Sequence, residues 1–151
     1  MPHTLEATVD ISAAPERVWA VVSDPTRMPE FSPNTARVFA LGTPRAGTWT
    51  INLNRHGRIY YPSTSRIVRF EPNRAFAFRM NENSTVWSFT LEPQESGTRL
   101  IQRRDIPNGV SKPIRLVIDA FLGGEQQFEQ NLTSGMDETL DKIRAAVESG
   151  N

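Results

Sequence analysis

The apolar residues of the C-terminal segment constrain the fold of this chain more than any other sequence feature. They recur at intervals of three, four and seven positions, which places them on one stripe of an α-helix: Phe121, Phe128, Leu132, Met136, Leu140, Ile143 and Val147. Ser111 is a suitable N-cap, Pro113 is tolerated in a first helical turn, and Gly150 lies just past the end. The pattern predicts one amphipathic helix over Ser111–Glu148, with an apolar face long enough to cover a whole sheet.

Three glycines fall inside this predicted helix, and each costs about 1 kcal/mol relative to alanine in a helix interior. Gly123 and Gly124 are adjacent, and Gly135 follows them. One interpretation of the adjacent pair is a break between a short leading helix and the main helix. The other is a kink beside a cavity, at an entrance that opens to admit a ligand.

The rest of the chain predicts strands, with two short helices near its start. Residues 4–11 alternate as a half-buried strand does, a first helix opens at Pro15, and Pro29 and Pro33 limit a second helix that begins after Asp24. A period of two then predicts six strands with short links, hence an antiparallel meander, over residues 35–41, 48–54, 59–70, 75–80, 85–92 and 98–106. The predicted class is α+β, with a curved seven-stranded antiparallel sheet around the C-terminal helix.

Alternation along each strand also predicts which side chains face that helix. Trp49, Phe78 and Trp87 each belong to an apolar face of their strand and are expected inside. If Leu100 points inward, Gln102 and Arg104 share its side and place polar groups in an apolar interior. The alternative is that this end of the strand already lies at the open rim, in water.

The strand over residues 59–70 permits two registers. Tyr60 faces the interior in one of them, with Thr64, Arg66 and Val68, and Tyr61 in the other, with Ser63, Ser65 and Ile67. Pro62 would mark a bulge between the two registers. One tyrosine is expected to reach the interior, and Tyr60 is the one assigned to the candidate site.

Length and composition fit a single domain over residues 1–151. The chain has 151 residues, 38% of them apolar and 23% charged, which is enough for a substantial core. It has no apolar run near the length of about 18 residues that a membrane span needs, and residues 1–6 lack the hydrophobic core of a signal peptide. We therefore expect a cytoplasmic location and no stable membrane insertion.

Few residues are available for catalysis or metal binding. The chain has no cysteine, and its two histidines are His3 near the terminus and His56 in a predicted hairpin turn, both poorly placed as general bases. No HExxH, GxSxG, phosphate-binding glycine loop or dinucleotide fingerprint is present. The sequence therefore assigns no catalytic residue and predicts neither a metal nor a cofactor.

Charge is balanced overall but unevenly distributed. The formal net charge is zero, which argues against generic nucleic-acid binding without excluding RNA or a ribosome as partner. Between Glu30 and Glu71 there is no acidic residue, while six arginines fall there: Arg37, Arg45, Arg55, Arg58, Arg66 and Arg69. This basic stretch is either a solvated outer sheet face, weakly attracted to the acidic C-terminal helix, or a site for an anionic ligand or RNA backbone.

The order of one strand, two short helices, six strands and a long helix resembles the START-related superfamily often called SRPBCC, in its polyketide cyclase/dehydrase and lipid-transport branch. The resemblance covers nearly the whole chain and is carried by residues 9–19, Asp24-Pro25, Phe31-Ser32-Pro33, residues 47–58, Phe70-Glu71-Pro72, Trp87-Ser88-Phe89 and Gly97-Thr98. These motifs are specific for the fold and weak for function, because they punctuate turns and line a core. Phe31 departs from the pattern, since relatives often carry tryptophan there.

The resemblance implies the helix-grip fold with a hydrophobic cavity between sheet and helix, used for lipids, sterols, polyketides, quinones or plant hormones. It therefore implies a binder of a small hydrophobic molecule, and apolar, aromatic lining with a few polar groups suits such a site. The candidate ligand-binding residues are Trp49, Tyr60, Phe78, Trp87, Gln102, Arg104, Phe121, Glu125 and Phe128. Helical geometry places Glu125 beside the inward stripe, where we expect it to pair with Arg104 at the cavity mouth.

Two other functions fit the same sequence. One is a cyclase, aromatase or dehydratase, in which the cavity holds a folded polyketone and polar groups polarise a carbonyl. The other is a regulatory or toxin-like interaction protein that uses the basic face over residues 37–69. The sequence does not name the ligand or the oligomeric state, because pocket shape and surface complementarity are tertiary properties.

Overall fold

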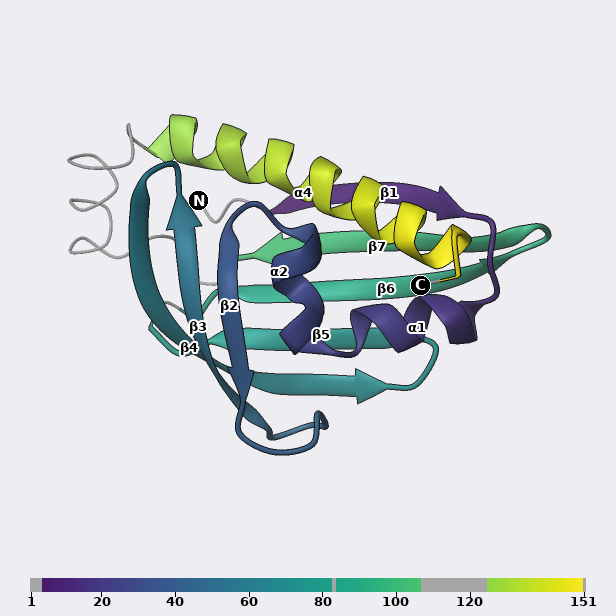
Figure 1. Cartoon of the computed structure of the whole chain (residues 1–151), viewed down its shortest axis with the longest axis horizontal. Coiled ribbons are helices and arrows are strands. Elements are labelled where there is room, and N and C mark those ends of the chain that lie inside the picture. The colour runs from purple at the N-terminus through teal and green to yellow at the C-terminus, as the bar shows by residue number, and fades with distance from the viewer. Residues whose placement is uncertain (1–3, 83, 107–124, 151) are drawn as a thin grey trace.

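The computed structural model describes residues 4–82, 84–106 and 125–150, with side chains of the last segment described from residue 130 onward (Figure 1). The elements in chain order are β1 (Leu5–Ile11), α1 (Pro15–Val22), the 3₁₀ turn η1 (Pro25–Arg27), α2 (Met28–Phe31), β2 (Thr35–Ala40), β3 (Trp49–His56), β4 (Ile59–Glu71), β5 (Ala75–Met80), β6 (Val86–Gln94), β7 (Gly97–Asp105) and α4 (Glu125–Glu148). Every predicted strand is confirmed, with ends that agree within two residues.

The strands form one seven-stranded antiparallel sheet in the order β1-β7-β6-β5-β4-β3-β2. Consecutive strands from β2 to β7 are neighbours, as a meander requires, and β1 pairs with β7 as an edge strand. The short helices occupy the chain between β1 and β2, as predicted, and Asp24 caps η1 by accepting the Thr26 amide at 3.0 Å. The predicted α+β helix-grip architecture is confirmed.

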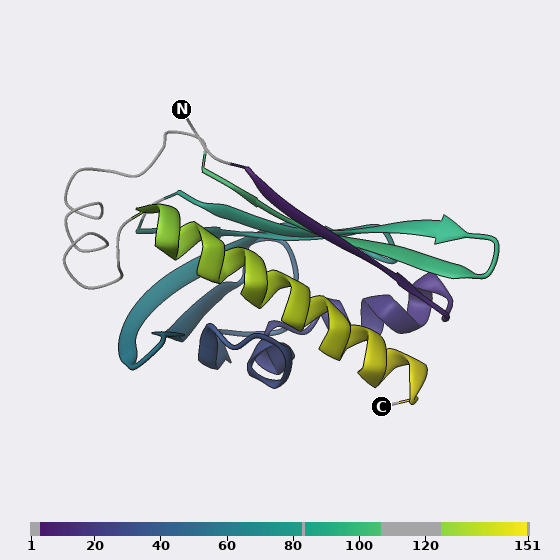
Figure 2. The same ribbon diagram turned by 90° about the horizontal axis from the view of Figure 1, so that it is seen from above.

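The described helices lie on one side of the sheet (Figure 2). Helix α4 crosses that side and packs against β1, α1 and α2. Its predicted apolar stripe is confirmed from residue 132 onward, because Leu132, Met136, Leu140, Ile143 and Val147 are all buried. The predicted start at Ser111 and the Gly123-Gly124 pair lie outside the described residues, so both interpretations of the glycine pair stay open.

Gly135 has a packing reason. A Cβ atom built on Gly135 would lie 2.4 Å from the Asn34 side-chain nitrogen and 3.5 Å from the Pro33 ring. Glycine therefore lets the middle of α4 approach the connection between α2 and β2 closely, which offsets its poor helix propensity.

Part of the core lies where α1 meets β4, β5 and β6. Trp19 of α1 packs edge-on against Phe70 and Phe76, with ring centroids 5.1 and 6.4 Å away. Phe89 and Ile67 complete this end of the interior and are almost fully buried. No described helix is long and apolar enough to span a membrane.

Candidate functional site

The inner faces of β3 and β4 are polar. Thr50 and Asn52 of β3 are buried, as are Ser63 and Ser65 of β4. Trp49, next to Thr50 in sequence, is 47% exposed and points away from α4. The prediction that Trp49 faces the interior is therefore wrong.

A hydrogen-bond network explains why polar side chains can occupy this face. Thr50 Oγ1 donates to Asn52 Oδ1 at 2.9 Å and also hydrogen-bonds the Ser65 hydroxyl. Asn52 Nδ2 lies 3.3 Å from Ser63 Oγ, and Asn54 Nδ2 donates to the same hydroxyl at 2.7 Å. Burying a hydroxyl or an amide costs little when it has a partner, so the network removes the usual penalty for polar groups in an interior.

The register of β4 is the one that turns Tyr61 inward. Tyr61 is the cross-strand partner of Asn54, shares its face with Ser63 and Ser65 and is 36% exposed, whereas Tyr60 pairs with Arg55 and is 55% exposed. The assignment of Tyr60 to the interior is therefore wrong. The strand needs no bulge at Pro62, because its register shift lies between Ile67 and Arg69.

The inner faces of β5, β6 and β7 combine aromatic rings with two polar side chains. Phe78 and Trp87 are cross-strand partners, and Trp87 is in turn opposite Arg104. Both rings are half-buried, while Gln102 and Arg104 are only 6% and 5% exposed. The predicted inward orientation of these four residues is confirmed, and the alternative that Gln102 and Arg104 lie in water at the rim is wrong.

Arg104 joins the aromatic and polar parts of the interior. Its guanidinium carbon lies 5.8 Å from the centroid of the Trp87 ring, within the range of a cation–π contact. Burial raises the pKa of the Tyr61 phenol above its ordinary value of 10, and the positive charge of Arg104 acts in the opposite direction. The guanidinium therefore lies within electrostatic range of both an indole ring and a phenol that stays protonated.

Gln102 has an unused hydrogen-bond acceptor. Its side-chain oxygen is buried and accepts no hydrogen bond from the described part of the chain. Its cross-strand neighbours are Ala7 and Phe89, neither of which has a polar side chain. An unsatisfied buried carbonyl costs about 1–3 kcal/mol, so this oxygen is suited to accept a hydrogen bond from a bound molecule.

The remaining candidate residues come from the C-terminal helix region. Phe121 lies outside the described residues, and Glu125 and Phe128 belong to α4 but their side chains are outside the described part. The pairing of Arg104 with Glu125 therefore stays a prediction.

His56 ties the β3–β4 hairpin to α4. It is the last residue of β3 rather than a surface turn residue, and its Nε2 lies 3.1 Å from Asn131 Nδ2 of α4. Burial lowers the pKa of His56 below its ordinary value of 6.5. The prediction of a simple exposed turn is wrong because the curved sheet brings this hairpin against the helix.

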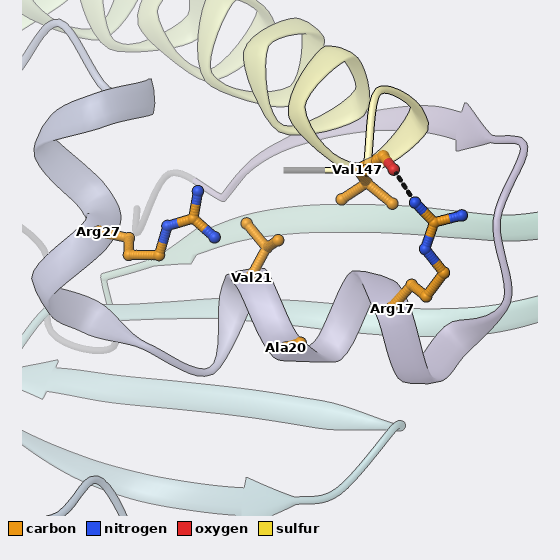
Figure 3. Close-up of a pocket in the computed structure, with 6 residues that line it drawn as sticks. Arg17, Ala20, Val21, Arg27 and Val147 are labelled. Atoms are coloured by element: carbon orange, nitrogen blue, oxygen red, sulfur yellow. Dashed lines mark hydrogen bonds between the residues drawn. The ribbon is translucent and has the colours of Figure 1, made fainter.

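A groove of about 200 Å³ lies elsewhere, between α1, η1 and the end of α4 (Figure 3). Arg17 on its wall donates to the Val147 carbonyl at 2.5 Å, at the negative end of the α4 dipole. Arg27 on the opposite wall forms two 3.1 Å hydrogen bonds with Glu30. Both guanidinium groups are engaged in structural contacts, so this groove is not the candidate site.

The candidate site is therefore the inner face of the sheet, with a hydroxyl and amide network on β3 and β4 and a ring-lined part with Gln102 and Arg104 on β5 to β7. Sequence reasoning missed Thr50 and Asn52, and it left open the register that turns Tyr61, Ser63 and Ser65 inward. One signal could have found them: Thr50, Asn52 and Asn54 alternate in step with Ser63 and Ser65 on the neighbouring strand, so pairing of the strands brings these polar side chains together.

A curved antiparallel sheet that closes on a long C-terminal helix, with a mixed polar and aromatic interior, defines the helix-grip class of proteins. Within that class, the chain belongs to the family described as polyketide cyclase / dehydrase and lipid transport, whose family model matches residues 2–148. Among curated protein sequences, none matches this chain significantly.

Solved structures share the fold over nearly the whole chain. A polyketide-cyclase-like protein, Cgl2372 from Corynebacterium glutamicum, is 27% identical, with a TM-score of 0.64 over 98% of this chain and 93% of its own. The Zhui aromatase/cyclase from Streptomyces sp. R1128 is 17% identical, with a TM-score of 0.79 over 98% of this chain and 94% of its own. Ara h 8.0201 is 13% identical, with a TM-score of 0.71 over 99% of this chain and 100% of its own.

Proposed function

We propose that this protein binds a small, mainly hydrophobic molecule that carries at least one hydrogen-bonding group, held between the sheet and α4. The observation that carries the proposal is the buried Gln102 oxygen, which lacks a partner in the described chain and lies on the face shared by Arg104 and Trp87. Membership of a family described by cyclase, dehydrase and lipid-transport activities supports the same ligand class.

The chemistry of the inner face narrows that class. Phe78, Trp87 and Phe89 offer apolar and aromatic contact area, which suits fused rings or an isoprenoid chain. Gln102 accepts a hydrogen bond from a ligand hydroxyl, and the Arg104 guanidinium donates to a carbonyl or an ionised phenol. An oxygenated aromatic compound or an oxygenated lipid satisfies both requirements.

A second function, catalysis of a cyclase, aromatase or dehydratase reaction, is favoured by one observation. The positive charge of the Arg104 guanidinium acts on the Tyr61 phenol, on the inner face of the sheet. A raised pKa keeps Tyr61 protonated, so it would donate a hydrogen bond to a substrate carbonyl, and Arg104 would stabilise negative charge that develops on the same oxygen. The Zhui aromatase/cyclase shares this fold, which makes such a reaction a specific one to assay.

The binding experiment compares 2-naphthol with naphthalene, which differ by one hydroxyl group. Binding is measured by quenching of tryptophan fluorescence. We expect 2-naphthol to bind more tightly than naphthalene, because only its hydroxyl can donate to Gln102. Gln102→Leu should lower the affinity for 2-naphthol about fivefold to tenfold, the value of one hydrogen bond, and leave naphthalene unchanged.

Gln94→Leu is the matched control, because Gln94 is exposed at the end of β6. No saturable binding of either compound, together with no molecule co-purifying in native mass spectrometry, would refute ligand binding. If Gln102→Leu lowered the affinity for both compounds equally, the result would contradict the role of the amide oxygen while leaving the apolar site in place.

We further propose that residues 1–151 act as a single domain in the cytoplasm. The lack of cysteine supports a reducing compartment, and the described elements all belong to one sheet and the helices packed on it. Fractionation of the source cells tests the location.

A further inference from the structure

The outer face of β2, β3 and β4 carries large apolar side chains in water. Six of them are between 45% and 60% exposed, and we call them the outer patch: Phe39, Leu41, Trp49, Ile51, Tyr60 and Val68. Single exposed apolar residues are ordinary, whereas contiguous ones mark surfaces that meet another apolar phase.

Strand pairing brings the β2 and β3 members of the outer patch together. Phe39 is the cross-strand partner of Ile51, and the Leu41 amide donates to the Trp49 carbonyl at 2.9 Å, so the β2 and β3 members lie side by side. The residues between them on β3 are the buried Thr50 and Asn52 of the interior, so the patch points away from α4. The described helices all lie on the other side of the sheet and leave this face uncovered (Figure 2).

Arginines border the outer patch. One carboxylate also lies there, because Glu82 accepts hydrogen bonds from the amide and hydroxyl of Thr64, the cross-strand partner of Ile51. Arg66 is directly opposite Trp49 on one side and Arg79 on the other, and Arg37 is opposite Leu53. All three arginines are exposed, and in the described part of the chain none of them forms an ion pair. Like charges directly opposite on neighbouring strands repel, so an anion between Arg66 and Arg79 would relieve an unfavourable contact.

Charge and composition select among the partners that such a face could meet. A second copy docked patch to patch would bring its arginines toward those of the first, which opposes self-association. Single-stranded RNA would contact the arginines and stack on the aromatic rings, but Leu41, Ile51 and Val68 have no face on which a base can stack. A lipid surface suits the aliphatic, aromatic and cationic side chains alike. Aliphatic groups enter the boundary of the acyl chains, Trp and Tyr favour the membrane–water interface, and arginines reach phosphate groups.

We propose that the outer patch docks this protein onto the surface of an anionic lipid bilayer, with Arg37, Arg66 and Arg79 at the lipid phosphates. This contact is peripheral and reversible, since it needs no inserted helix. It uses the sheet face opposite to the candidate ligand site, so it does not depend on the proposed ligand.

The test uses the whole chain and sedimentation with two kinds of vesicle, phosphatidylcholine alone and phosphatidylcholine mixed with phosphatidylglycerol. We expect binding to the mixed vesicles that weakens with salt, and a blue shift of tryptophan emission that Trp49→Phe abolishes. Arg66→Gln should weaken that binding about fivefold, the value of one cation near an anionic surface.

Arg144→Gln on the exposed face of α4 is the matched control and should bind as the unmodified protein does. Ile51→Ser tests the contribution of the apolar side chains of the outer patch and should reduce binding to the mixed vesicles. Thermal melting confirms that each variant folds. Three results would overturn the proposal. The first is no binding to the mixed vesicles, and the second is concentration-dependent dimers that Ile51→Ser dissociates. The third is that the unmodified protein binds RNA and no vesicles, and that Trp49→Ala abolishes the RNA binding.

Discussion

Replacement of Gln102 by leucine should stabilise the ligand-free fold. The Gln102 oxygen is buried without a partner in the described chain, and a group in that state costs about 1–3 kcal/mol. Leucine has a similar volume and no polar atom, and the residues opposite it, Ala7 and Phe89, are apolar. We therefore expect a gain of about 1 kcal/mol in the free energy of unfolding, or a rise of about 2–4 °C in Tm for a domain of this size.

Urea denaturation of the ligand-free protein measures this change, with Gln94→Leu as the exposed control. Any co-purifying molecule has to be extracted first, because a ligand that binds only the folded state raises the apparent stability of the unmodified protein by mass action. A loss of more than about 1 kcal/mol in Gln102→Leu would refute the reasoning, since it would mean that the amide is satisfied in the folded protein. If the Gln102 amide serves to bind a ligand, Gln102→Leu should both stabilise the fold and weaken the binding of 2-naphthol.

Three further predictions concern the scaffold. Burial lowers the pKa of His56 below 6.5, so the neutral imidazole contributes stability that is fully present above pH 6.5 and is lost as the pH falls through the lower folded-state pKa. An NMR titration should show the lowered pKa. His56→Gln should reduce the change of folding stability with pH over that interval. Leu140→Ala should cost about 2–5 kcal/mol in denaturation because Leu140 is almost fully buried on α4, whereas Leu41→Ala, at an exposed position, should stay within about 0.5 kcal/mol; equal losses would contradict the assignment of inner and outer faces. Gly97→Ala should cost about 1–3 kcal/mol, because its Cβ would lie 2.0 Å from the Ile11 carbonyl oxygen, and an unchanged Tm would contradict that close approach.

The sequence alone determined the architecture and half of the candidate site. Apolar residues at helical spacing identified α4, because a helix places Leu140, Ile143 and Val147 on one stripe, whereas a strand would put Leu140 and Ile143 on opposite faces. Alternation with short polar links identified the strands and the meander. On β5, β6 and β7 the apolar residues also gave the correct inner face, and of the two alternatives left open for Gln102 and Arg104, the inward one that follows from their parity with Leu100 is correct.

Only the tertiary structure decided which faces of β3 and β4 are inside. Alternation defines two faces of a strand but does not say which one meets the core, and the usual rule that apolar residues are buried failed for Trp49. It failed because Thr50, Asn52, Ser63 and Ser65 satisfy one another across paired strands, which makes the polar face inexpensive to bury. The same pairing turned Tyr61 rather than Tyr60 toward the inner face of the sheet, and the curvature of the sheet brought His56 to Asn131. These contacts join residues distant in sequence or depend on strand register, so they are fixed by the assembled sheet and not by local pattern.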